Sequence, residues 1–174
     1  MKEKNIGWYI KSLCILFILI GIDQGSKLIA SLHLKDKSSI PIIKNVFELE
    51  YLENKGAAFG IFQGKQLFLI LFTGVIILAL FWGYTKLPLN KRFLPLRICL
   101  LLIIAGAIGN LIDRIAYQYV VDFLYFKLIQ FPIFNIADCY VTISAVVMIL
   151  LVLFYYKDED FSFIKIKEKN GGQV

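Results

Sequence analysis

Four stretches of the chain are almost continuously apolar, and each is long enough to form a membrane-spanning helix. They cover roughly residues 12–30, 67–84, 96–112 and 137–156. About 20 mostly apolar residues suffice for a helix to cross the hydrocarbon core of a bilayer. The pattern therefore predicts a polytopic, mainly α membrane protein with four transmembrane helices, built as a single domain over residues 1–174. Four spans place both termini on the same side of the membrane.

A different pattern lies between the first two apolar stretches. The segment from Val46 to Glu53 begins with apolar and acidic residues in strict alternation. A period of two is typical of a β-strand with one face in water. We therefore expect a small β-sheet on the outer membrane surface, within a strand region of roughly residues 40–59.

Lysine and arginine residues indicate the orientation of the chain. They gather at the amino end, in the loop 85–97, which contains no acid, and in the tail 157–174. By the positive-inside rule these three regions are cytoplasmic, including both termini. The loops 31–66 and 113–136 then lie outside the cytoplasm. We expect the tail to be a solvated cytoplasmic end near anionic lipid.

The composition excludes several other classes of protein. The chain of 174 residues is 59% hydrophobic and 18% charged, with a mean hydropathy of +0.72, which rules out a soluble or disordered protein. The net charge of +6 is not arranged as a basic stripe with exposed aromatic residues, so no nucleic-acid partner is expected. Cys14, Cys99, Cys139 and the single His33 are scattered, which predicts neither a metal site nor a disulfide.

The polar residues within or beside the apolar stretches gather at one boundary of the membrane. Chain direction places all of them at the outer side: Asp23, Lys27, Asn54, Lys55, Gly56, Asn110, Asp113, Asn135 and Asp138. Charged groups in a membrane segment are costly and usually functional. We expect no comparable set at mid-depth or at the cytoplasmic ends. The pattern favours a one-sided site over a path through the membrane.

Two groups of these residues have both structural and functional interpretations. Asp23 and Lys27 are four residues apart on a helix, so they can pair on one face and fix the first span against its neighbours. Gly106 and Gly109 permit close packing of the third span just before Asp113 and Arg114. Asp113 is disfavoured at a helix carboxyl end and should have a partner, either Arg114 or a backbone donor. A structural clamp and a substrate contact both remain open for these two residues.

Two further carboxyl groups suggest acid–base chemistry. Asn135 and Asp138 are spaced as a helix cap, but an acid at a helix amino end is also kept charged and available as a base. Asp122 lies in an apolar stretch whose next basic residue is Lys127, so its carboxyl should hold its proton more tightly. Different environments for two acids are what a dyad sharing one proton requires. Spacing alone leaves the pairing of Asp122 with Asp138 a guess.

Five short motifs follow one another between residues 21 and 140. They are Asp23-Gln24-Gly25-Ser26-Lys27, Asn54-Lys55-Gly56-Ala57-Ala58-Phe59-Gly60, Gly109-Asn110-Leu111-Ile112-Asp113-Arg114, Val121-Asp122-Phe123 and Phe134-Asn135-Ile136-Ala137-Asp138. Each motif alone is weak. Together, in this order and between these membrane segments, they resemble bacterial lipoprotein signal peptidase, also called signal peptidase II.

The resemblance implies an aspartic endopeptidase of the bacterial cytoplasmic (inner) membrane, with its active site at the extracytoplasmic face. Such enzymes cut prolipoproteins before a diacylglyceryl-modified cysteine, need no metal or other cofactor, contact membrane lipid, and are inhibited by cyclic peptides of the globomycin type. The family's catalytic acids fall on Asp122 and Asp138. Its substrate contacts fall on Asn54, Asn110, Arg114 and Asn135, and its supporting positions on Asp23, Lys27, Gly56 and Asp113. The strand region would be the family's cradle on the membrane surface.

A rival interpretation is a non-enzymatic membrane scaffold or transporter subunit. Its acids would be structural ion pairs rather than catalytic groups. A transporter also requires polar residues along a path through the bilayer, and the apolar stretches lack them at mid-depth.

Overall fold

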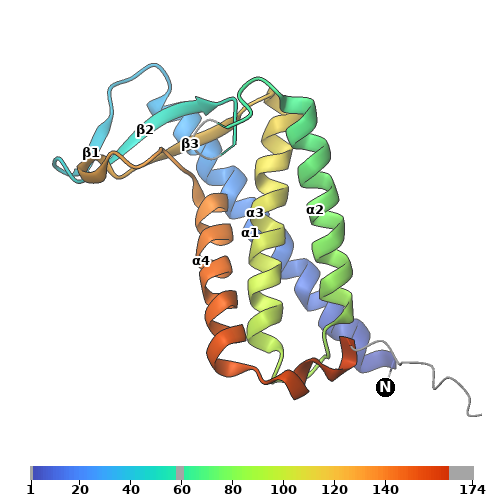
Figure 1. Cartoon of the computed structure of the whole chain (residues 1–174). Coiled ribbons are helices and arrows are strands. Elements are labelled where there is room, and N and C mark those ends of the chain that lie inside the picture. Colours follow the sequence, from blue (N-terminus) through green and yellow to red (C-terminus); the bar gives the residue numbers. More distant parts are fainter. Residues whose placement is uncertain (1, 58–60, 165–174) are drawn as a thin grey trace, which may run out of the picture.

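Four long helices form the body of the protein in the computed structural model, which describes residues 2–57 and 61–164 (Figure 1). They are α1 (Lys2–Leu34), α2 (Gln66–Lys86), α3 (Leu94–Tyr117) and α4 (Ile136–Leu150), which continues into the π-helical turn η3 (Leu151–Tyr155). All four are long and apolar enough to cross a membrane, as the sequence predicts. Two are longer than expected: α1 is already helical at Lys2, and α3 continues past Ile112 to Tyr117.

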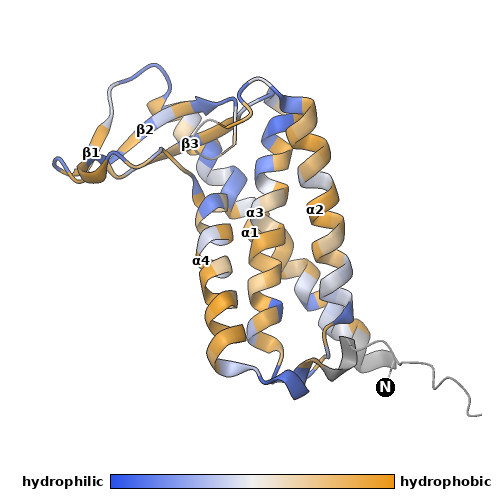
Figure 2. Cartoon of the chain, viewed as in Figure 1, coloured by the Kyte–Doolittle hydropathy of each residue, from blue (hydrophilic) through white to orange (hydrophobic). Residues whose placement is uncertain are grey.

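The apolar side chains of the bundle point mostly outward. Figure 2 shows hydrophobic residues along most of the length of the helices, with hydrophilic residues near the sheet, and large apolar side chains of α1, α2 and α4 are exposed. Helix α3 is the exception, because it packs against the other three and is half-buried along its span. An apolar surface of this extent requires an apolar solvent, and lipid supplies it. The fold is therefore a lipid-embedded bundle arranged around α3.

A small antiparallel sheet covers one end of the bundle, which we call the sheet end. Its strands are β1 (Ile40–Ile43), β2 (Phe47–Asn54) and β3 (Val120–Tyr125), in the order β1-β2-β3. The first two lie in the strand region that the sequence predicts. The third strand, β3, was not predicted, because the alternating pattern was recognised only in the segment from Val46. It comes from the second outer loop and pairs with β2. The end of α1 packs under the sheet, with Ala30 and Leu34 against Val121 and Phe123.

The first part of the tail is docked onto the opposite end of the bundle, which corrects the expectation of a solvated tail. The 3₁₀-helix η4 (Asp158–Ile164) follows α4. Asp160 accepts from Arg92 at 2.8 Å, and Phe161 packs against Phe93 and Tyr156. The Arg92 side chain holds the pKa of Asp160 below its usual range. Residues 165–174 of the tail lie outside the described residues.

Arg97 corrects a second expectation. The sequence pattern places it in a basic cytoplasmic loop, but it lies inside α3 and is only 2% exposed. Its guanidinium donates to the Tyr84 hydroxyl at 2.8 Å and to the Leu87 carbonyl at 3.3 Å, and Tyr84 also contacts Ser12. The end of the bundle away from the sheet therefore has a buried polar cluster, which we did not expect there. These contacts tie α1, α2 and α3 together.

Candidate active site

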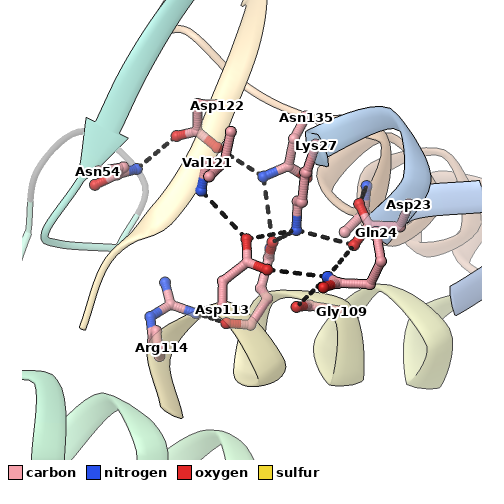
Figure 3. A network of polar contacts seen from close by, with 12 residues as sticks. Asp23, Gln24, Lys27, Asn54, Gly109, Asp113, Arg114, Val121, Asp122 and Asn135 are labelled. Atoms are coloured by element: carbon pink, nitrogen blue, oxygen red, sulfur yellow. Dashed lines mark hydrogen bonds and ion pairs between the residues drawn. The ribbon is translucent and has the colours of Figure 1, made fainter. Parts of the chain in front are cut away.

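The sequence-predicted site residues come together at the sheet end of the bundle. They belong to α1, α3, α4, β2, β3 and the turn after β2, and they form one connected network of polar contacts (Figure 3). The network has a buried ionic part between α1 and α3, and a part made of amides and carboxyls where β3 meets the start of α4.

A buried lysine is the centre of the ionic part. Lys27, which is 3% exposed, lies 2.9 Å from Asp23 and 3.0 Å from Asp113. The predicted Asp23–Lys27 pair is thus present, and Asp113 joins it. Asp113 also accepts from the backbone N–H of Val121 at 3.2 Å, so its partner is a backbone donor together with Lys27 rather than Arg114. The two carboxylates and their shared ammonium link α1, α3 and β3.

Gln24, for which the sequence pattern predicts no role, completes this ionic part. Its side-chain amide donates to Asp113 at 2.9 Å and to the Gly109 carbonyl at 3.1 Å. The available signal was its position beside Asp23 in an otherwise apolar helix, where a polar residue needs a partner. Gln24 therefore belongs with the supporting residues of the site.

Two glycines of α3 let the neighbouring elements approach closely. A Cβ atom added at Gly109 would lie 2.3 Å from the Asp23 carboxylate, and one added at Gly106 would lie 2.4 Å from the Ala137 carbonyl oxygen. Any side chain at either position would displace backbone or the buried ion pair. The expected close packing of the third span is confirmed, and it brings α1 and α4 against α3 at the site.

Asn135 connects the helix cap to the second carboxyl group. Its side-chain oxygen accepts from the Asp138 backbone N–H at 2.9 Å, and the Asp138 carboxylate accepts from the Asn135 backbone N–H at 3.2 Å. This reciprocal capping box starts α4, as the spacing predicts. The Asn135 amide nitrogen in turn donates to the Asp122 carboxyl at 2.6 Å. One side chain thereby contacts both Asp122 and Asp138.

Asp122 lies on β3 with a second amide partner. Its side chain is 1% exposed and accepts from the amide of Asn54, at the end of β2, at 2.8 Å. Burial raises the pKa of Asp122 to about 7, and the nearby charge of Asp138 adds to this effect. Its carboxyl therefore retains a proton that an exposed aspartate would lose, which agrees with the expectation from its apolar sequence surroundings.

Asp138 has a different set of partners. The amide nitrogen of Asn110 donates to its carboxylate at 2.8 Å, while the oxygen of the same amide accepts from Lys27 at 2.9 Å. Its place in the first turn of α4 gives it the positive end of the helix dipole, which Asp122 on β3 lacks. The two acids therefore differ in their hydrogen-bond partners and in their position relative to a helix end.

Arg114 and Gly56 close the site on the side of the turn after β2. The Gly56 backbone N–H donates to the Asn54 side chain at 2.9 Å, and the Gly56 carbonyl accepts from Arg114 at 3.1 Å. Arg114 is mostly buried, and its Nε–H has no hydrogen-bond partner among the described residues. The motif residues at 58–60 lie outside the described residues. Within residues 2–57 and 61–164, no cluster of three or more His, Cys, Asp or Glu side chains is placed to hold a metal ion.

A pair of carboxyl groups with these properties can activate water. A charged carboxylate accepts a proton from water, and a protonated one polarises a carbonyl oxygen. The arrangement is therefore suited to hydrolysis of an amide bond.

Comparisons with known proteins show the family of this chain. The sequence model of the family described as signal peptidase (SPase) II matches residues 15–154. The chain belongs to the signal peptidase II family. It is 47% identical over 157 residues to the lipoprotein signal peptidase of Clostridium tetani, covering 87% of this chain and 97% of that protein. It is 45% identical over 141 residues to the lipoprotein signal peptidase of Clostridioides difficile, covering 81% and 93%.

Solved structures show the same fold. A bacterial membrane enzyme determined by the in meso method at 2.3 Å resolution superimposes with a TM-score of 0.73 and 33% identity, covering 91% of this chain and 93% of that chain. A second, at 1.9 Å resolution, gives a TM-score of 0.72 and 32% identity, covering 84% and 94%. The protein is thus a multi-pass bacterial membrane peptidase of the signal peptidase II family.

Proposed function

We propose that the protein is an aspartic endopeptidase that removes signal peptides from prolipoproteins, using Asp122 and Asp138 as its catalytic dyad. The observation that carries this proposal is the set of partners of the two acids. Asp122 is bonded to the amides of Asn54 and Asn135, and Asp138 to the amide of Asn110 and to backbone N–H. Lys27 is paired with Asp23 and Asp113 instead, which leaves the two acids available for chemistry.

The proposed reaction is a direct attack by water on the scissile carbonyl. Asp138 as carboxylate accepts a proton from water while the oxygen attacks the carbonyl carbon, and protonated Asp122 donates its proton to the carbonyl oxygen. In the second step the tetrahedral intermediate collapses. Asp122 recovers its proton from the intermediate, and Asp138 gives its proton to the leaving amine. The cycle returns both acids to their starting states.

Four polar residues are the proposed substrate contacts: Asn54, Asn110, Arg114 and Asn135. The three amides lie within hydrogen-bonding distance of the catalytic carboxyls, so each can orient a carboxyl and also meet the substrate backbone. The buried Nε–H of Arg114, which has no partner among residues 2–57 and 61–164, is proposed to donate to a substrate carbonyl or lipid ester. Asp23, Lys27, Gly56 and Asp113 are proposed to support this arrangement rather than to take part in chemistry.

The position of the site fits a substrate anchored in lipid. The dyad lies on β3 and in the first turn of α4, where the apolar bundle meets the sheet, so a peptide bond near the lipid head groups would reach both the acids and water. We further propose that the sheet end is extracytoplasmic, that both termini are cytoplasmic, and that the diacylglyceryl-modified cysteine and globomycin-type cyclic peptides bind here.

The rival function is a scaffold or transporter subunit whose acids are structural staples. A staple is normally an acid paired with a base, as Asp23 and Asp113 are paired with Lys27. Asp122 and Asp138 have amide partners instead, which favours catalysis. Asparagine variants discriminate between the two functions, because a staple contributes to folding whereas a catalytic acid contributes to rate.

The decisive experiment is a gel-shift assay with purified protein and a diacylglyceryl-modified prolipoprotein. The unlipidated precursor and the variants Asp122→Asn and Asp138→Asn are run beside it, with Asp160→Asn as a matched control away from the site. We expect wild type and Asp160→Asn to cleave the lipidated form only. The cleavage rate should fall by ~10²–10⁴-fold in Asp122→Asn and Asp138→Asn, while both variants stay folded. An intact lipidated precursor after incubation with wild type, in several detergents and in lipid, would overturn the proposal.

A further inference from the structure

Strand β2 has an edge that the rest of the sheet does not cover. The eight-residue strand pairs with β1 only from Phe47 to Leu49, since β1 begins at Ile40 opposite Leu49. From Leu52 to Asn54 it pairs with β3 along its other edge. The chain segment that joins α1 to β1 contacts this half of β2 through the Lys35 side chain, which pairs with Glu53 at 2.8 Å, and beyond Lys35 it arches away (Figure 1). Among the described residues, the backbone from Glu50 to Asn54 therefore has one edge without a pairing strand, which we call the open edge.

The open edge leads directly into the proposed active site. It ends at Asn54, whose side chain donates to the Asp122 carboxyl at 2.8 Å. Leu52 stands opposite Asp122 in the β2–β3 register, so both side chains point to the same face of the sheet. Leu52 is 42% exposed, although it lies beside a fully buried carboxyl. Uncovered backbone and an exposed apolar side chain thus adjoin the dyad.

An uncovered strand edge is a template for another extended chain, and proteins normally block such edges. Peptide recognition by strand addition uses this property, with main-chain hydrogen bonds supplying affinity. We propose that the segment of the prolipoprotein that follows the cleavage point binds as an added strand on the open edge, antiparallel to β2. This inference rests on the proposed function. The direction follows from β2 itself, which runs toward the site, whereas the mature segment runs away from it.

Sheet geometry gives the position of this added strand in the substrate. A chain added on the open edge of β2 lies two strand spacings of about 4.8 Å from β3, the strand that carries Asp122. The substrate must cross this distance from the cleavage point, and an extended chain needs about three residues to do so. Pairing should therefore begin at about the fourth mature residue. Because main-chain hydrogen bonds are independent of side chains, one edge can accept mature segments of different sequence. Alternate residues of the added strand direct their N–H groups toward β2, and the others direct them away.

The test is a backbone scan of a lipidated peptide substrate with the full-length protein in lipid. The parent peptide carries the diacylglyceryl-modified cysteine, and each mature position from the second to the eighth is N-methylated in turn. A second series replaces the same amides by esters, which removes the N–H without adding a methyl group. We expect kcat/KM to fall about tenfold at alternate positions from about the fourth onward in both series, with the intervening positions near the parent value.

The outcomes separate this inference from the function on which it rests. Cleavage of the parent with no alternation in either series would overturn strand addition while leaving the peptidase assignment intact. Losses in the N-methyl series alone would show steric exclusion and would also overturn it. If the parent peptide itself is not cleaved, the proposed function fails, and the inference fails with it.

Discussion

Lys27 donates to the amide oxygen of Asn110 at 2.9 Å, and this bond decides which end of that amide faces Asp138. With its oxygen held by the ammonium, Asn110 presents its nitrogen to the Asp138 carboxylate at 2.8 Å. The same oxygen also accepts from the Asn135 amide at 3.2 Å. The buried ion cluster between α1 and α3 is thereby connected to both acids of the proposed dyad.

Replacing Lys27 by methionine should strongly destabilise the protein. Asp23 and Asp113 would then be buried without a cation, a loss that typically costs about 3–5 kcal/mol. Lys35→Met is the matched control, since Lys35 pairs with Glu53 at 2.8 Å on the surface and its loss should change stability little. Thermal unfolding in detergent measures both. Equal midpoints for the two variants would mean that the buried ion cluster does not stabilise the fold.

Substitutions of Asn135 should separate helix capping from the contact with Asp122. Serine keeps a cap for α4 but cannot donate across to Asp122, so Asn135→Ser should retain most of the stability and lose activity. Asn135→Ala should lose activity and also about 1 kcal/mol of stability, because it removes the cap. Unfolding midpoints and initial cleavage rates give the two readouts. Wild-type activity in Asn135→Ser would show that the amide serves only as a cap.

The rate of cleavage should fall as the pH rises through about 7. The proposed mechanism needs one proton on the pair, and burial raises the pKa of Asp122 to about 7, so the pair loses this proton near neutrality. The kcat/KM profile of a lipidated peptide reports this ionisation in the free enzyme. Because the two acids titrate together, the limb belongs to the pair. A profile that stays flat from pH 6 to pH 9 would contradict the proposed protonation states.

Stability should change with pH in opposite directions for Asp122→Asn and Asp160→Asn. The folded-state pKa of Asp122 is raised, so wild type loses stability as the pH rises from its ordinary value near 4 toward about 7. The unfolding midpoint of Asp122→Asn relative to wild type should therefore increase across this range. Arg92 depresses the pKa of Asp160, so the stabilising contribution of Asp160 is present above pH 4 and lost below it. The relative midpoint of Asp160→Asn should thus be lowest at neutral pH.

Gly109 should tolerate no side chain. Gly109→Ala places a methyl group 2.3 Å from the Asp23 carboxylate, and we expect a loss of about 1–3 kcal/mol together with lower activity. Gly74→Ala, on α2, is the matched control, because its added Cβ meets nothing within 4 Å and alanine is the better helix former. Unfolding midpoints of the two proteins should move in opposite directions. A neutral Gly109→Ala would mean that α1 and α3 can separate without cost.

The membrane architecture could be predicted because it depends on local pattern. The number of helices follows from runs of apolar residues, since a span must satisfy its backbone hydrogen bonds internally and present apolar side chains to lipid. The capping box at Asn135 and Asp138 and the Asp23–Lys27 pair are also short-range features. Each joins residues three or four apart on one helix, a spacing that can be read directly from the sequence.

Contacts between distant residues depend on the tertiary structure. The sequence shows an acid in an apolar stretch at Asp122, but only the pairing of β3 with β2 places it beside Asn54, 68 residues earlier in the chain. In the same way, Gln24 meets Asp113 and Lys27 meets Asn110 only because Gly109 lets α1 approach α3 closely. Arg97 shows where the local pattern misled. A basic residue near a helix end indicated a loop, but its contacts with Tyr84 and Leu87 hold it inside the bundle.

The sequence by itself determined which segments enter the membrane and which chemical groups are available, because hydropathy and helix spacing act locally. Only the folded packing decided which of those groups touch, because a hydrogen bond requires its two partners within about 3 Å, wherever they lie in the chain.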